Sequence, residues 1–310
     1  MSETAPQPCL NCGTPLQGTY CYQCGQKAQN RRLPLKALLH DVLHDLLHLD
    51  HKILESLWLL IRRPGFLAEE YLAGRRVRHV PPFRLYVIAS FALFMAFSFI
   101  HVGDTHGKAN KATPSNVVTL HSSTPDHKEA GQTALSEETD KAEHTGKAGK
   151  AESGEKEGKA NAWAKDLNAR AKLAQQDPER FYHTFLSNLS KSLFVLMPVF
   201  AALLLLLHLR WSESLFVDHM VVALHHHVVC FLAILLLMGL NALPGDGWGC
   251  IPGPIIFFAP LVHLAATLQR LYRRGWLRSI AKAILVSGVY GFIVSVVLIG
   301  LLWLSLPKVH

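Results

Sequence analysis

The sequence lacks several features that would place it in a common class. Residues 1–8 are polar, with no short apolar segment before a cleavage site, which argues against a secretory signal peptide. There is no Walker loop, no Gly-x-Ser-x-Gly elbow, no His-Glu-x-x-His pair and no dinucleotide fingerprint, so no motif indicates an enzyme. The 6 cysteines form no evenly spaced framework, which argues against a secreted disulfide-rich fold.

Large apolar side chains are also scarce in the middle of the chain. Residues 104–160 are rich in Lys, Glu, Ala, Gly, Ser and Thr. Such a segment cannot bury enough surface to offset its ordering entropy, so we expect it to be disordered. Its charges nearly cancel, and the net charge of +8 comes from Arg-rich patches beside apolar runs. That pattern suits the anionic inner face of a membrane better than a nucleic acid.

Apolar residues are instead concentrated in five runs, each long enough to predict a transmembrane helix. They are Phe83–Val102, Ser192–Leu209, Val221–Leu240, Ile251–Leu268 and Ala281–Leu306. Asp177 followed by Pro178 is typical of a helix start, ahead of the second run. The fourth run contains three prolines and is the least typical. The sequence therefore predicts an all-α membrane protein with about five transmembrane helices.

The basic residues around these runs predict an orientation. They cluster before the first run and between the fourth and the fifth: Arg62, Arg63, Arg75, Arg76, Arg78, Arg270, Arg273, Arg274, Arg278 and Lys282. The loop at 241–250 has no Lys or Arg. Because Lys and Arg are enriched in cytoplasmic loops, we expect the N-terminus in the cytoplasm and the C-terminus in the periplasm of a bacterial inner membrane. The 104–160 loop would then be periplasmic.

The strongest local motif is a doubled Cys-x-x-Cys, made by Cys9, Cys12, Cys21 and Cys24. Each pair makes a tight knuckle that directs two thiolates at one point, and two knuckles give the tetrahedral sulfur site that zinc prefers. Free thiols or a redox dithiol are the alternatives, but a redox pair needs no second copy. Four thiolates leave no open coordination position, so we expect a structural Zn²⁺.

Histidines form a second pattern, within an amphipathic stretch at residues 33–61. His40, His44 and His48 repeat every four residues, with His51 nearby, so that on a helix they form one stripe. One interpretation is a metal site or a pH sensor. The other, which we favour, is an interfacial helix whose polar face uses histidine, because no second element with matching ligands is evident.

The third apolar run begins with FVDHMVVALHHH, and ionisable residues at membrane depth are candidates for function. Asp218 and His225 share one helix face, His219 and His226 share another, and His263 lies in the fourth run. They could form a proton relay or a metal site. Alternatively, Asp218 and His219 lie at the membrane edge and the other histidines are interhelical hydrogen bonders.

Three blocks together resemble a family of uncharacterised bacterial membrane proteins, described as a domain of unknown function with an N-terminal zinc ribbon. The blocks are the Cys9–Gln26 knuckles; Leu49–Lys52 with Arg63–Gly65, Tyr71–Arg76 and Pro82–Tyr86; and Met197–Ala201 with Asp218–His225. Relatives tend to have Glu where this chain has Asp218. The resemblance implies a membrane location and zinc, and no activity.

The predicted organisation follows from these patterns. It comprises a zinc ribbon (1–30), a cytoplasmic amphipathic and basic segment (31–82), a first transmembrane helix (83–103), a periplasmic low-complexity loop (104–176) and helices two to five (177–310). We expect a non-enzymatic membrane protein in contact with the lipid bilayer, whose ribbon recruits or senses a cytosolic protein partner. Nucleic acid is disfavoured, because the ribbon is not basic. The alternatives are a proton or metal-ion transporter or channel using Asp218 and the histidines, and an intramembrane metalloenzyme.

Overall fold

The computed structural model describes residues 7–28, 52–109, 165–208, 215–242, 252–273 and 275–307. These residues are mainly helical, and within them strand pairing is limited to isolated bridges in the N-terminal module. The all-α prediction is therefore confirmed. The chain divides into two compact units, one made of Met1–His101 with Tyr182–Ser305 and the other of Val102–Phe181 with Leu306–His310.

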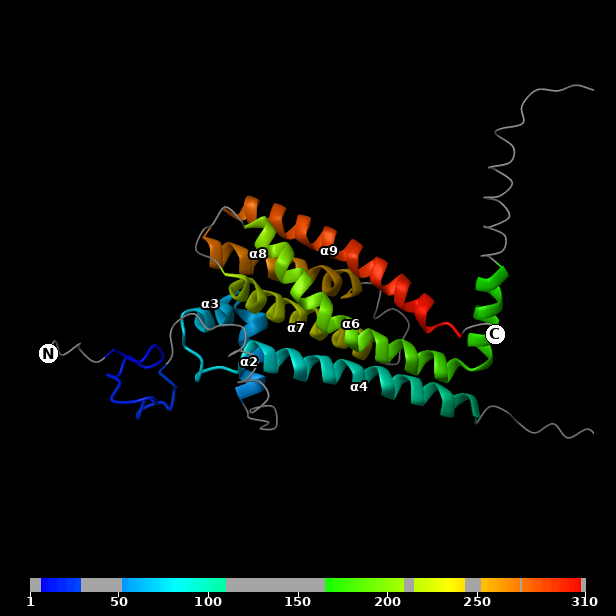
Figure 1. The fold of residues 1–310 in the computed structure, drawn as a ribbon, viewed down its shortest axis with the longest axis horizontal. Helices are drawn as coiled ribbons and strands as arrows, with labels where there is room; N and C mark the ends of the chain where they lie inside the picture. The colour runs from blue at the N-terminus through cyan, green and yellow to red at the C-terminus, as the bar shows by residue number, and fades with distance from the viewer. Residues whose placement is uncertain are drawn as a thin grey trace, which may run out of the picture. The chain divides into compact units, whose positions relative to one another are not determined.

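Seven helices are named within the described residues, in this order along the chain. They are α2 (Lys52–Arg62), α3 (Phe66–Leu72), α4 (Pro82–Ala109), α6 (Pro178–Leu207), α7 (Phe216–Asn241), α8 (Pro252–Tyr272) and α9 (Trp276–Ser305). In the first unit the long helices run alongside one another, and the short helices α2 and α3 lie at one end of them (Figure 1). Residues 165–176, in the second unit, are also helical.

Four of these helices are long and apolar enough to cross a membrane. The qualifying segments are Pro82–Phe99 of α4, and the whole of α6, α7 and α9. The chain is thus a multi-pass membrane protein, as predicted. α8 corresponds to the predicted fourth span and is one helix of 21 residues that continues through Pro260. It is not among the four, so a fifth crossing stays a prediction.

Some helix ends lie where the sequence signals predict them, and one does not. The backbone N–H of Arg180 donates to Asp177 Oδ1 at 3.1 Å, so Asp177 caps α6 and Pro178 begins it, as predicted. The left-handed conformation of Gly65, with φ of 76°, separates α2 from α3. α4 continues to Ala109, past the predicted boundary at residue 103.

The core of the first unit is built around α7. Val221, Leu224 and Val228 on α7 are fully buried, together with Phe200 on α6 and Tyr86 on α4. The Tyr86 ring makes an edge contact with the ring of His227. α9, by contrast, exposes much of its apolar surface. α7 is therefore the central helix, and the histidines that it carries are interior residues.

Candidate functional site

The N-terminal module consists of two knuckles of the same construction. The N–H of Gly13 donates to the carbonyl of Cys9, and the N–H of Gly25 to the carbonyl of Cys21, both at 2.8 Å. Gly13 and Gly25 have φ of 78° and 73°, a left-handed conformation that glycine adopts without strain. Each knuckle is closed by an isolated bridge, Pro8 to Pro15 in the first and Tyr20 to Lys27 in the second. The glycines thus make the turns that complete the two predicted knuckles.

The two knuckles bring all four cysteine sulfurs together. The Sγ atoms of Cys9 and Cys24 are 3.6 Å apart, and those of Cys12 and Cys21 are 3.5 Å apart. All four lie within 4.8 Å of one another. In a tetrahedral zinc site with Zn–S bonds of 2.3 Å, neighbouring sulfurs are about 3.8 Å apart. The group therefore fits a four-coordinate metal ion, and it is the one such cluster among the described residues.

The thiols do not titrate alike. The hydrogen bond between the side chains of Cys12 and Thr14 lowers the pKa of Cys12 to about 6, whereas burial raises the pKa of Cys24 to about 11. A metal ion binds thiolates, so loading the site displaces the proton that Cys24 holds at neutral pH. Four thiolates fill a tetrahedral shell and leave no position for a substrate or an activated water. The chemistry that the site can supply is structural.

The ribbon is attached to the segment that precedes α4. The side-chain amide of Gln26 donates to the carbonyl of Gly74 at 2.8 Å and accepts from the N–H of Arg76 at 3.1 Å. Gln26 is buried. At Gly74, where φ is 88°, a Cβ atom would lie 2.7 Å from the side chain of Leu10. The four-cysteine module and the segment before α4 are thus joined by an interlocking contact, in which the left-handed φ of Gly74 favours glycine.

The segment next to this contact carries two carboxylates paired with arginines. Arg75 makes a bidentate pair with Glu70, at 2.7 and 2.6 Å, and this pairing lowers the pKa of Glu70. Arg270 on α8 donates to Glu69 at 2.7 Å. Two of the arginines that predicted a cytoplasmic face therefore also hold α3 in place, one of them across to α8.

The predicted stripe of His40, His44, His48 and His51 lies outside the described residues. The helix that follows it, α2, has two different faces. Ile53, Ser56 and Leu60 are buried against the helical core, whereas Leu54 and Trp58 are 74% and 57% exposed. An apolar outer face on a helix beside the first membrane span is typical of an interfacial helix.

The structure separates the residues of the predicted intramembrane site. Asp218 lies at the start of α7, where its Oδ2 accepts the N–H of Leu215 at 3.0 Å. His219, also in the first turns, is hydrogen-bonded through Nδ1 to the hydroxyl of Tyr272 at 2.8 Å. The Tyr272 ring stacks on His208, with 4.0 Å between ring centroids. Asp218 and His219 therefore belong to the end of the helix bundle.

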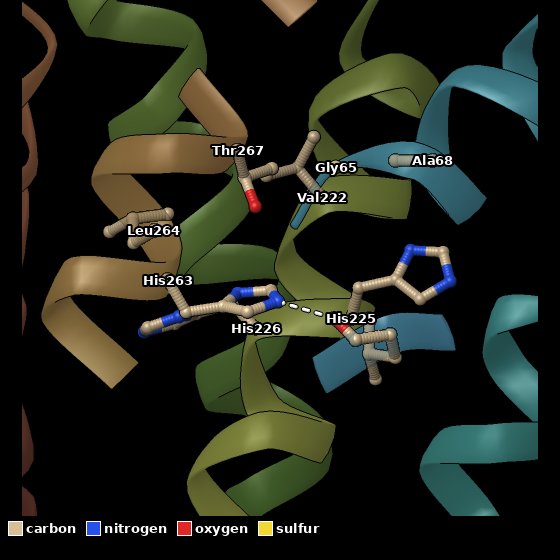
Figure 2. Close-up of a pocket in the computed structure, with 9 residues that line it drawn as sticks. Gly65, Ala68, Val222, His225, His226, His263, Leu264 and Thr267 are labelled. Carbon is tan, nitrogen blue, oxygen red and sulfur yellow. Dashed lines mark hydrogen bonds between the residues drawn. The ribbon is translucent and has the colours of Figure 1, made fainter. Parts of the chain in front are cut away.

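The other three histidines line a small chamber between α2, α3, α7 and α8 (Figure 2). His263 Nε2 is hydrogen-bonded to the carbonyl of Leu60 at 2.7 Å. His225 Nδ1 is hydrogen-bonded to the carbonyl of Val221 at 3.0 Å. In Figure 2 the His225 ring lies on the side of Ala68, away from His263. The chamber therefore receives imidazoles from two helices, but they do not converge on one point.

The polar atoms around this chamber are incompletely satisfied. His225 Nε2, His226 Nδ1 and Thr267 Oγ1 are buried and have no hydrogen-bond partner among the described residues. The chamber has a volume of about 10 Å³, about the space that one water molecule needs. The chamber is too small for a chain of waters.

Sequence reasoning missed the residues that partner these histidines. The hydroxyl of Tyr290 on α9 donates to His227 Nε2 at 2.7 Å, because Nδ1 of that ring donates to the carbonyl of Ala223, and neither Tyr290 nor His227 is among the predicted site residues. Tyr272 and His208 were missed as well. The only signal for each of these residues is an aromatic or imidazole group within or beside an apolar run. To pair them, the rotation of each helix about its axis must be known, and sequence alone does not supply it.

The fold and the site define a class, a multi-pass membrane protein with an N-terminal four-cysteine module. Residues 50–94 match the model of a family described as "Protein of unknown function (DUF3667)". This range covers α2, α3 and the first part of α4, and includes most of the second block of the resemblance noted in the sequence. No curated protein and no solved structure matches the chain.

Proposed function

We propose that the protein is a non-enzymatic component of a bacterial inner membrane whose cytoplasmic zinc ribbon recruits or senses a protein partner. The observation that carries this proposal is the closed set of four sulfurs on a module that is fixed to the membrane domain through Gln26. A site with no open position supplies rigidity and not catalysis. The attachment gives the ribbon a defined position beside the membrane.

The surface of the ribbon suits a protein partner. Tyr20 and Tyr22 are 60% and 65% exposed, and tyrosine is among the residues that contribute most to protein interfaces. Residues 7–28 contain one Lys and no Arg, whereas a nucleic-acid surface needs a basic patch. We therefore propose that the contact surface is the second knuckle, which carries Tyr20 and Tyr22, and we expect it to bind protein.

The proposed orientation follows from the basic residues near the ends of the helices. The Arg-rich segments before α4 and between α8 and α9 would face the cytoplasm, with α8 as a crossing helix. The ribbon would then lie in the cytoplasm and the C-terminus in the periplasm. Reporter fusions at Asp246 and His310 should score as periplasmic, and a fusion at Arg274 as cytoplasmic. A cytoplasmic score at His310 would contradict the crossing by α8.

A second candidate function is transport of protons or metal ions through the histidines of α7. It is favoured by the unpartnered nitrogens of His225 and His226, since buried polar atoms without partners are uncommon outside functional sites. The chamber that they line has room for one water, which does not make a path. An intramembrane metalloenzyme ranks third, because the described residues outside the ribbon hold no cluster of three metal-ligating groups.

The recruitment proposal is tested by photo-crosslinking from the ribbon of the full-length protein in cells. A photoreactive amino acid replaces Tyr22, and adducts are compared between the parent, a Cys21→Ser/Cys24→Ser variant and a Gln26→Ala variant. We expect a discrete protein adduct that disappears in the cysteine variant and weakens in Gln26→Ala. Zinc content, measured on purified protein, should fall from one per chain to none in the cysteine variant alone. An adduct that persists without zinc would contradict the proposal.

A further inference from the structure

The outer side of α2 carries an apolar stripe. Leu54, Trp58 and Ile61 are each more than half exposed. At 3.6 residues per turn, these three side chains lie within about 60° of one another around the helix axis. A helix that faced water on this side would carry polar side chains there. The stripe therefore requires an apolar surrounding.

α2 packs against the side of a membrane-spanning helix. Leu60 of α2 lines the small chamber together with Val222 and His226 of α7. These two residues lie six and ten residues after the start of α7, which is about 9 and 15 Å along a helix. Ser56 Oγ on α2 accepts the backbone N–H of Val80 at 3.2 Å, and α4 begins two residues later. α2 is thus held within the length of α7 and beside the start of α4, where its apolar side chains can reach lipid.

The polar side chains of α2 lie on the remaining side of the helix. Lys52, Glu55, Arg62 and Arg63 fall within about 100° of one another around the axis. Around the helix, the side that is buried against the core is followed by the apolar stripe and then by this polar side. A helix that lies along a membrane surface needs these three sides, because one meets the helix bundle, one the acyl chains and one the water.

Two cations on this polar side have no counter-charge in the described parts of the chain. Arg62 and Arg63 are exposed and form no ion pair among the described residues. By contrast, the two arginines that hold α3 in place are each paired with a carboxylate. Arg62 Cζ lies 5.7 Å from the centroid of the Trp58 ring, so this charge is held at the border of the apolar stripe. Both guanidinium groups are thus available to an anion from outside the protein.

We propose that α2 is a docking surface for anionic phospholipid, with its apolar stripe among the acyl chains of one leaflet and with Arg62 and Arg63 on the phosphate groups. A guanidinium donates two parallel hydrogen bonds to a phosphate, and a leaflet with net negative charge attracts basic residues near its surface. Zwitterionic phospholipid fits the stripe equally well but lacks the net charge. The stripe therefore fixes the depth of the contact, and the arginines select the lipid.

The arrangement of charge and packing favours lipid over a protein that would cover the same stripe. The cations border an apolar surface that lies within the length of a spanning helix, which is where phosphate groups and acyl chains meet. Glu55, the acidic residue of α2, lies two helical turns from Arg62 and does not neutralise it. This proposal does not depend on what the ribbon binds.

The test uses the full-length protein in phosphatidylcholine nanodiscs that contain a trace of a probe lipid. The probe is phosphatidylglycerol or phosphatidylcholine, with a diazirine in the part of one acyl chain nearest the head group. After illumination, peptide mapping by mass spectrometry locates the labelled residues. One basic residue near an anionic surface contributes about a factor of five, so we expect residues 52–62 to be labelled at least about fivefold more by phosphatidylglycerol. The preference should shrink at high salt. Residues 289–304 of α9 carry no charged side chain and should be labelled equally by both probes.

Substitutions with a matched control separate the arginines from the stripe. Arg62→Gln with Arg63→Gln should remove the preference for phosphatidylglycerol. Arg278→Gln removes an exposed arginine from α9 and should leave labelling of α2 unchanged. Trp58→Gln should lower labelling of α2 by both probes and keep their ratio. Glu55→Gln should raise the ratio, and it tests the proposal even if the arginine double variant does not fold. The thermal transition of each variant in one detergent shows which variants are folded.

Three results would overturn the proposal. The first is equal labelling of residues 52–62 by both probes in the parent protein. The second is a preference for phosphatidylglycerol that survives in a folded arginine double variant. The third is expected if a second copy of the chain or another protein covers the stripe, because residues 52–62 would then stay unlabelled by either probe while residues 289–304 are labelled.

Discussion

α7 and α9 have almost the same hydropathy and opposite surroundings. The most apolar stretches of the two helices have nearly equal mean hydropathy, yet 61% of that stretch is buried in α7 and 6% in α9. In a bilayer, apolar side chains gain little by leaving lipid for protein, so packing and polar contacts decide which helix lies inside. α7 carries four histidines. Two of them, His219 and His227, are hydrogen-bonded to tyrosines of α8 and α9, and the other two are hydrogen-bonded within α7. The comparison teaches that polar residues, and not hydropathy, mark the central helix.

The comparison is tested most severely by deleting the same apolar group from each helix. Leu224 on α7 is fully buried, and Leu285 on α9 is 55% exposed. Leu224→Ala should lower the free energy of unfolding by about 2–5 kcal/mol, because it leaves a cavity in the core. Leu285→Ala should change it by less than about 1 kcal/mol. Thermal unfolding of the two purified proteins in one detergent measures both; equal losses would show that α9 is buried in the native assembly.

A second test asks whether the histidines of α7 are only structural. His225→Gln with His226→Gln keeps side-chain hydrogen bonding but loses titration and the stacking on Phe200, which is worth about 1 kcal/mol. The recruitment proposal expects a small loss of stability and an unchanged crosslink from Tyr22. It also expects no proton flux in proteoliposomes that contain the parent protein or the double variant. Flux in the parent that vanishes in the double variant would instead support transport.

The contact that joins the two helices gives a smaller effect. Tyr290→Phe removes the hydrogen bond between α9 and His227 while keeping the ring in contact with Phe200. Hydrogen bonds between membrane helices contribute on average about 0.6 kcal/mol, so we expect a loss near that size. The measurement is the unfolding free energy in detergent, with Ser295→Ala as the control, since Ser295 bonds within α9. A loss above about 2 kcal/mol would mean that α9 depends on this contact to dock.

The smallest effect is expected where the core meets solvent. Arg270→Gln breaks the ion pair with Glu69. The side chains of Arg270 and Glu69 are 38% and 40% exposed. Exposed ion pairs contribute about 0–1 kcal/mol, so stability should fall by only a few tenths and the fall should shrink at high salt. A large loss that salt does not reduce would show that this end of α8 is shielded from water.

The parts of this molecule that sequence predicted are those that depend on local patterns. The two Cys-x-x-Cys knuckles, the Asp177–Pro178 start of α6 and the apolar spans need only neighbouring residues. The grouping of Asp218 with His225 was a different inference. Both lie on one helix face, but their positions along α7 give them different partners. Spacing alone could not indicate that His219 bonds Tyr272 or that His263 bonds a backbone carbonyl of α2, because those contacts depend on helix packing.

The contact between Gln26 and Gly74 has an entropic consequence. It joins residues 48 apart in sequence, so forming it costs chain entropy. Its two hydrogen bonds contribute about 1 kcal/mol each, and the packing of Leu10 on Gly74 adds a comparable amount. The ribbon is therefore held to the segment before α4 by a few small contributions that oppose chain entropy. A change that removes or strengthens one of them changes how firmly the ribbon is held.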